Sequence, residues 1–222
     1  MNTHEIRVTG DGSKTIFLPE LNETYHSTHG ALREARHVFI EHGLELLKDR
    51  REVHVLEVGF GSGLNALLTG CWSEDNRVSV NYTALEAFPL STAICFELDY
   101  PSQIGEHSIF LNQTIIQSAW RKENQVSAHF SLTKIDTRIQ VFETDQCFDL
   151  IYFDAFGPRA QAEMWEYAIL EKAHNFLKTG GTLVSYCAKG QFKRDLKAVG
   201  FRVESLPGPP GKREMTRAKR LV

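Results

Sequence analysis

The chain has 222 residues, of which 42% are hydrophobic and 24% are charged, and its formal net charge at pH 7 is −3. This composition excludes a disordered chain and a collagen-like repeat, and no run approaches the roughly 18 apolar residues of a membrane-spanning helix, so no membrane partner is expected. The length suits a single domain over residues 1–222, in which residues 1–29 would form an N-terminal hairpin and cover segment.

Strand-like and helix-like patterns alternate along the chain. In chain order we expect a hairpin over 5–18, a helix over about 30–49, a strand over 53–58, a helix over 64–72, a strand over 78–85, helices over 91–99 and 115–122, strands over 128–135 and 148–153, a helix over 161–177, a strand over 182–186, a helix over 191–199, and strands over 201–206 and 214–222. In the helix over 30–49, Glu34 and Glu41 fall outside the apolar stripe. The alternation indicates βαβ crossovers, so we predict an α/β fold in which a mostly parallel seven-stranded sheet has helices on both faces.

A glycine-rich loop follows the strand over 53–58. Gly59, Gly61 and Gly63 alternate there, which permits positive φ and lets a ligand approach the backbone, and a helix N-terminus follows. Such turns also occur merely to reverse the chain. The dinucleotide pattern would need glycine where Leu64 stands, and Glu57 suits a cationic ligand better than a pyrophosphate. The pattern Glu-x-Gly-x-Gly-x-Gly resembles the first motif of class I S-adenosylmethionine-dependent methyltransferases, which have a Rossmann-like fold.

Three further carboxylates follow predicted strands. Glu86 could accept hydrogen bonds from ribose hydroxyls, and Asp136 could accept one from an adenine amino group. Asp154 follows an almost uninterrupted apolar strand, so it would emerge at the centre of the ligand-binding edge and is the predicted catalytic residue. The alternatives are an exposed strand-end charge for Glu86 and Asp136 and a structural turn residue for Asp154.

The resemblance extends over nearly the whole chain to one family, the methyltransferase domain of MnmC and its stand-alone relatives, which act in 5-methylaminomethyl-2-thiouridine biosynthesis at the tRNA wobble position. The matching segments are 25–31, 57–65, 86–89, 154–158, 181–186 and 208–215. The most restrictive of them are Asp-Ala-Phe-Gly-Pro at 154–158 and Gly-Lys-Arg-Glu-Met at 211–215.

The resemblance implies S-adenosylmethionine as cofactor and the primary amine of 5-aminomethyl-2-thiouridine in tRNA as methyl acceptor. The cofactor residues would be Glu57, Gly59, Phe60, Gly61, Gly63, Asn65, Glu86, Asp136 and Asp154. Asp154 would orient the amine and take a proton, Tyr25 would close over the substrate, and Phe156 would stack on the uridine. No flavin oxidase domain is recognised in the sequence, so a separate oxidase or upstream tRNA-modifying enzyme is an expected partner.

The charges support contact with RNA at the C-terminal end of the chain. Residues 189–222 contain ten basic and three acidic residues, which leaves 15 basic and 25 acidic residues in the first 188. Lys189, Lys212 and Arg213 are the predicted contacts to RNA phosphates or to the substrate pocket. A solvated basic face is the plainer alternative.

The cysteines bear on location and on metals. Cys71, Cys95, Cys147 and Cys187 are widely spaced, with no C-x-x-C pair and no histidine at ligand spacing. They suit a reducing cytoplasm and predict no structural metal. Three other functions stay open: a methyltransferase acting on a small-molecule or protein amine, a nicotinamide dehydrogenase, and a non-catalytic cofactor-binding module. The sequence does not fix the oligomeric state.

Overall fold

The computed structural model describes residues 4–221. The first three residues of the predicted N-terminal segment and Val222 of the predicted last strand lie outside the described residues. No helix between residues 4 and 221 combines the length and the apolar character that crossing a membrane requires.

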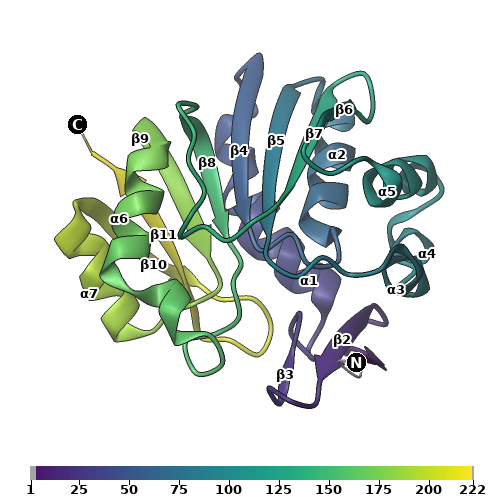
Figure 1. Cartoon of the computed structure of the whole chain (residues 1–222), viewed down its shortest axis with the longest axis horizontal. Helices are drawn as coiled ribbons and strands as arrows, with labels where there is room; N and C mark the ends of the chain where they lie inside the picture. The colour runs from purple at the N-terminus through teal and green to yellow at the C-terminus, as the bar shows by residue number, and fades with distance from the viewer. Residues whose placement is uncertain (1–3, 222) are drawn as a thin grey trace.

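Within residues 4–221 an eight-stranded sheet forms the centre of the molecule (Figure 1), in the order β10-β11-β9-β8-β4-β5-β7-β6. The strands are β4 (Glu52–Val58), β5 (Ser79–Glu86), β6 (Glu123–Gln125), β7 (Phe130–Asp136), β8 (Phe148–Phe153), β9 (Leu177–Ser185), β10 (Phe201–Pro207) and β11 (Glu214–Arg220). The five strands from β9 to β7 are parallel, whereas β6 and β11 pair antiparallel with β7 and β9. The mostly parallel sheet is confirmed, but the predicted number of seven strands is wrong, because the short polar segment of β6 carries no hydrophobic alternation.

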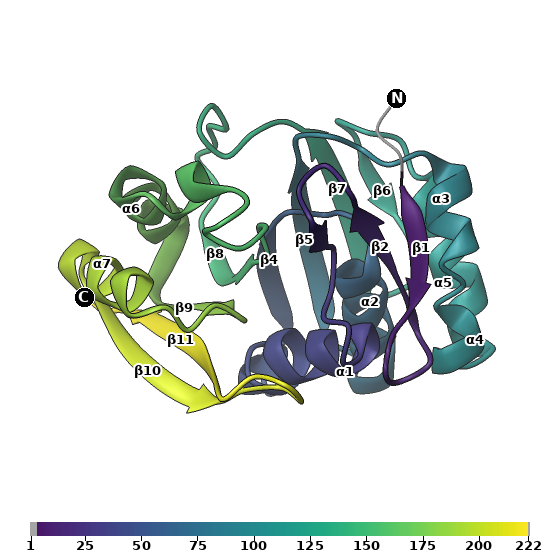
Figure 2. The ribbon, with the colours of Figure 1, turned by 90° about the horizontal axis from the view of Figure 1, so that it is seen from below.

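Helices cover both faces of the sheet (Figure 2). One face carries α1 (Ala31–Ala35), α2 (Leu64–Asn76), α3 (Thr92–Glu97), α4 (Pro101–Ile104) and α5 (His107–Gln117), and the other carries α6 (Tyr167–Phe176) and α7 (Gly190–Val199). Strand β8 shows why its sequence is apolar throughout: Leu150 and Tyr152 belong to the core on the α2 side, and Ile151 and Phe153 to the core on the α6 side. Successive side chains of a strand point to opposite faces, so a strand with helices on both faces is buried on both.

Three predicted helices are wrong in their extent. The helix expected over 115–122 is α5, which ends at Gln117, and residues 118–122 belong to no helix. The helix over 30–49 is divided into α1, the π-helical η1 (Arg36–Glu41) and the 3-10 helix η2 (Leu44–Leu47). The helix over 161–177 is divided into the 3-10 helix η3 (Ala162–Trp165) and α6, and Leu177 already belongs to β9. The glycines at 180 and 181 do not end a helix, because they lie inside β9, where its register against β8 shifts.

The N-terminal segment forms a separate small sheet, called here the N-terminal sheet: β1 (Glu5–Val8), β2 (Lys14–Leu18) and β3 (Glu23–Thr24). The predicted hairpin is confirmed, and β3 is an addition to it. The hairpin turn caps α1, since the backbone N–H of Arg33 donates to Asp11 Oδ2 over 2.9 Å and that of Ala31 to Thr9 Oγ1 over 3.3 Å. These bonds satisfy amide groups that a helix N-terminus otherwise leaves unpaired.

Replacing Gly59 should destabilise the fold more than replacing Gly180. Both glycines have positive φ, 98° and 79°, so alanine costs about 1–2 kcal/mol at either position. At Gly59 a Cβ would also lie 2.6 Å from the backbone oxygen of Asp154, whereas at Gly180 nothing lies within 4 Å. We expect Gly59→Ala to lower the free energy of unfolding in urea by about 3 kcal/mol or more. Equal losses in the two variants would contradict this packing.

Candidate functional site

A cavity of about 1130 Å³ lies where the main sheet meets the N-terminal sheet. Strands β4, β5 and β8 are parallel neighbours, so their carboxyl ends meet at one edge and their following loops line the cavity. Nine of the predicted site residues line it: Tyr25, Gly59, Phe60, Gly61, Asn65, Glu86, Asp154, Phe156 and Lys212.

Five predicted site residues do not line the cavity in the described part of the chain: Glu57, Gly63, Asp136, Lys189 and Arg213. The Asp136 carboxylate pairs with Arg121 Nε at 2.5 Å, and its side chain is 45% exposed. Lys189 directly precedes α7 and Arg213 precedes β11, and both are exposed to solvent. Asp136 thus ends β7 at the ligand-binding edge, in register with Glu86, but its side chain does not line the cavity. Two of the three predicted cations lie on the outer surface.

The glycine loop fixes the position of Glu86. The backbone N–H of Gly61 donates to Glu86 Oε2 over 2.8 Å, and that of Phe88 donates to Oε1 over 2.8 Å. Gly61 has a φ of 52°, and a Cβ there would lie 3.2 Å from the ring of Tyr25. Because both carboxylate oxygens are held by backbone donors, Glu86 stays oriented at the cavity edge with further lone pairs to offer a ligand.

Glu57 and Asp154 share one buried donor. The Nδ2 group of Asn65 donates to Glu57 Oε1 over 2.9 Å and to Asp154 Oδ2 over 2.8 Å. Glu57 is completely buried beneath the cavity, and within residues 4–221 its Oε2 atom has no hydrogen-bond partner. Burial raises the pKa of the Glu57 carboxyl well above its ordinary value. Burial, together with the nearby Glu34 carboxylate, raises the pKa of the Asp154 carboxyl to about 7.

Two aromatic side chains join the N-terminal sheet to the loop after β8. The rings of Tyr25 and Phe156 meet edge to face with centroids 5.1 Å apart, and the backbone oxygen of Phe156 accepts a hydrogen bond of 2.8 Å from Trp165 Nε1. Burial, with the Glu86 carboxylate adding to it, raises the pKa of the Tyr25 phenol far above its ordinary value. The phenol therefore remains protonated at neutral pH, so Tyr25 can donate a hydrogen bond but cannot serve as a base.

The cavity also contains an ion pair that the sequence pattern did not indicate. Lys212 Nζ pairs with Glu34 Oε2 and lies 3.9 Å from the centroid of the Tyr186 ring. Tyr186 in turn donates to the backbone oxygen of Ala155 over 2.8 Å. Glu34 lies outside the apolar stripe of its helix, yet it is only 7% exposed. A carboxylate at such a helix position gives no local signal of burial, because its partner is 178 residues away.

The residues that line the cavity fit a cationic cofactor. Among the described residues the lining contains six carboxyl side chains, of Glu20, Glu23, Glu34, Glu86, Asp154 and Glu163, and two permanent cations, of Arg138 and Lys212. The excess of carboxylates favours a ligand with positive groups such as a sulfonium and an ammonium. At Gly59 a Cβ would collide with the backbone oxygen of Asp154, so glycine allows the loop after β4 to approach the segment after β8 closely.

Asp154→Asn should change how stability depends on pH. Between the ordinary pKa of 3.8 and the folded value of about 7, the unfolded chain ionises at this position while the folded protein keeps the proton. This carboxyl therefore makes the wild type lose stability as the pH rises through that window. The free energy of unfolding of Asp154→Asn relative to wild type should rise by about 2 kcal/mol or more between pH 4 and pH 8. Asp145→Asn, the same change at an exposed position, is the control. A difference between Asp154→Asn and wild type that does not vary with pH would contradict the raised pKa.

Comparison with known proteins identifies relatives of this chain. A sequence profile of the S-adenosyl-L-methionine-dependent methyltransferase family matches residues 107–220. The chain is 29% identical to the tRNA 5-methylaminomethyl-2-thiouridine biosynthesis bifunctional protein MnmC of Cupriavidus metallidurans, over 96% of the chain and 33% of that protein. It is 31% identical to the protein of the same name from Leptospira borgpetersenii, over 89% of the chain and 32% of that protein. The chain thus spans about a third of the length of these curated relatives.

A solved structure with a similar name also matches this chain. The crystal structure of MNMC2 from Aquifex aeolicus matches with a TM-score of 0.80 at 27% identity, over 98% of this chain and 70% of that chain. The predicted resemblance to the MnmC family, the predicted methyltransferase activity and the predicted S-adenosylmethionine cofactor are confirmed by these matches. The chain belongs to the S-adenosyl-L-methionine-dependent methyltransferase family.

Proposed function

We propose that this chain methylates the primary amine of 5-aminomethyl-2-thiouridine at the wobble position of tRNA. The names of its relatives, which concern biosynthesis of 5-methylaminomethyl-2-thiouridine in tRNA, support this acceptor. The observation that carries the proposal is Asp154, a carboxyl group with a pKa of about 7 that faces a cavity rich in carboxylates. The relatives are bifunctional and about three times as long, so we assign only the methyl transfer to this chain. A tRNA acceptor also agrees with the cytoplasmic location expected from the cysteines.

The cofactor would bind along the glycine loop. Gly59, Phe60 and Gly61 would offer backbone to it, and Glu86 would accept hydrogen bonds from its ribose hydroxyls. Glu57 would act from beneath by holding Asn65, which it contacts over 2.9 Å. Asp136 stands beside Glu86 at the strand ends, and its carboxylate would have to leave Arg121 to reach an adenine amino group. Residues 137–140, which follow it, line the cavity and are better placed to meet the adenine.

The protein's chemical task is to deliver a neutral amine. When bound, S-adenosylmethionine supplies a methyl group that its sulfonium already activates. An alkylamine is mostly protonated near neutral pH, and only its neutral form has the lone pair that forms the new N–C bond. Asp154 would accept a hydrogen bond from the amine and take its proton, since a base is most effective when its pKa lies near the working pH. Tyr25 and Phe156 would enclose the acceptor, with Phe156 stacking on the uracil ring.

The basic residues would have different roles. Lys212 is inside the cavity and paired with Glu34, so it would position groups there and not contact the RNA backbone. Lys189 and Arg213 are exposed on segments that precede α7 and β11, and they remain the candidates for contacts to phosphates. Binding through such contacts should weaken steeply as the salt concentration rises.

Methyl incorporation into tRNA tests this proposal directly. The purified chain should transfer labelled methyl groups to tRNA from cells that carry 5-aminomethyl-2-thiouridine, and mass spectrometry of the nucleosides should show 5-methylaminomethyl-2-thiouridine. Asp154→Asn should lower kcat by about 100-fold or more, whereas Asp145→Asn, the same change at an exposed position, should keep it. No transfer to this tRNA, with transfer to a small-molecule or protein amine, would contradict the proposed acceptor. Binding of S-adenosylmethionine without any turnover would indicate a non-catalytic module.

The Glu34–Lys212 pair should set the pH at which the enzyme becomes active. Glu34 raises the pKa of Asp154 and Lys212 lowers it. Activity should rise with pH as Asp154 ionises, so Glu34→Gln should move the rising limb of kcat/KM to lower pH and Lys212→Met should move it to higher pH. The double variant should return toward the wild-type profile. If the two folded single variants shift the rising limb in the same direction, or do not shift it, the Glu34–Lys212 pair does not set the pH at which the enzyme becomes active.

A further inference from the structure

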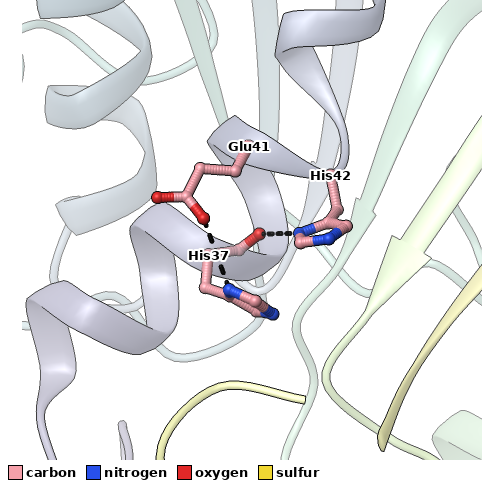
Figure 3. A group of neighbouring side chains, drawn as sticks. All are labelled: His37, Glu41 and His42. Carbon is pink, nitrogen blue, oxygen red and sulfur yellow. Dashed lines mark hydrogen bonds and ion pairs between the residues drawn. The ribbon is translucent and has the colours of Figure 1, made fainter. Parts of the chain in front are cut away.

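Three side chains of metal-binding type gather on the π-helical segment η1 and its end (Figure 3). His37, Glu41 and His42 each offer one ligand atom, and these atoms lie within 4.8 Å of one another. The π-helical geometry causes this grouping: the backbone N–H of His42 donates to the oxygen of His37, five residues earlier, over 3.3 Å. The two imidazole rings consequently lie side by side, with centroids 4.4 Å apart.

Both imidazoles are oriented by backbone carbonyls. His37 Nε2 lies 2.8 Å from the oxygen of Pro207, and His42 Nδ1 lies 2.8 Å from the oxygen of His37. A carbonyl oxygen only accepts, so these two nitrogens carry the ring protons, and in the neutral rings His37 Nδ1 and His42 Nε2 carry lone pairs. Histidines that bind metals show this arrangement, with one nitrogen donating to a backbone carbonyl or carboxylate and the other facing the metal.

The spacing of His37 and Glu41 matches that of two ligands of one metal ion. His37 Nδ1 and Glu41 Oε2 are 3.3 Å apart, which exceeds the roughly 2.7–2.9 Å of a charge-assisted hydrogen bond. A tetrahedral ion with bonds of about 2.0–2.1 Å holds its ligand atoms about 3.3–3.4 Å apart. A shared cation between them, either a proton on His37 or a metal ion, would hold two electron-rich atoms at this separation.

We propose that His37, Glu41 and His42 form a binding site for one divalent transition-metal ion of the Zn²⁺ type. Two imidazole nitrogens and one carboxylate oxygen suit such borderline ions better than Mg²⁺ or Ca²⁺. The side chains of Glu41 and His37 are 59% and 22% exposed, so an ion can enter from solvent and water can complete its coordination. The sequence predicted no metal site, because two histidines five residues apart meet only where the helix is π-helical.

The site is separate from the cavity but connected to it. None of its three residues lines the cavity described above. Through the bond to Pro207, however, His37 holds the start of the loop that leads to Lys212. A bound ion would fix the His37 ring and therefore one end of that loop, so its effect on stability is expected to exceed that of a surface ion without such an anchor.

Zinc titration of the full, untagged chain tests the proposal. After removal of metals with a chelator, the protein should bind one equivalent of ZnCl2, in competition with a chromophoric chelator, with a Kd below about 10 µM. His42→Gln should raise that Kd at least about tenfold. His54→Gln is the matched control, because His54 also lies beside a glutamate, Glu52 at 3.7 Å, and belongs to no described group of three ligands.

Two further measurements distinguish loss of zinc binding from loss of folding and from binding of zinc by a cysteine. Melting of the metal-free variants shows whether they fold, and Zn²⁺ should raise the Tm of wild type and of His54→Gln but not of His42→Gln. Cys147→Ser should bind like wild type, which would exclude capture of zinc by this exposed thiol. Failure of the wild type to bind at this affinity, or binding by folded His37→Gln and His42→Gln that is as tight as that of the wild type, would overturn the proposal.

Discussion

Two carboxyl groups, of the buried Glu57 and the half-buried Asp154, share a single amide donor, that of Asn65. In the interior of a protein, ionised carboxylates repel each other and lose hydration, so burial favours their protonated forms. Asn65 stands in the first turn of α2, directly after the glycine loop, and Asp154 stands at the end of β8. The parallel pairing of β4 with β8 and the backbone of Gly59 therefore decide how the three residues meet. The same contacts therefore influence whether the carboxyl groups of Glu57 and Asp154 are protonated.

Both the main sheet and the N-terminal sheet contribute residues that line the cavity. The ends of β4, β5 and β8 supply the glycine loop, Glu86 and Asp154, as in any open parallel sheet. The opposite wall comes from the N-terminal sheet and the segment after it, which carries Tyr25. Hydrogen bonds from α1 to the hairpin turn hold this wall in place. The enclosure is thus attached to the same helix that presents Glu34 to Lys212.

The local sequence pattern predicted the site residues that stand at the ends of strands. The glycine loop, Glu86 and Asp154 are each the first polar or flexible position after a buried strand, and all lie at the cavity. Asp136 follows the same rule but is drawn away by Arg121, which precedes the polar strand β6. The burial of Glu34 depends on a lysine near the other end of the chain. The π-helical turn at η1 involves a shift of one residue in hydrogen bonding, which hydrophobic periodicity does not register.

The pairing of Glu34 with Lys212 has a consequence for the order in which the protein is completed during synthesis. The hairpin, α1 and Glu34 leave the ribosome before Lys212, which is synthesised 178 residues after Glu34. Until then the Glu34 carboxylate has no cation in its final position, and a buried unpaired charge is costly. The wall of the cavity should therefore close late, after β9 and β11 have paired. A nascent chain that stops before residue 212 would hold its N-terminal sheet only loosely, so the cavity becomes enclosed only after Lys212 has been synthesised.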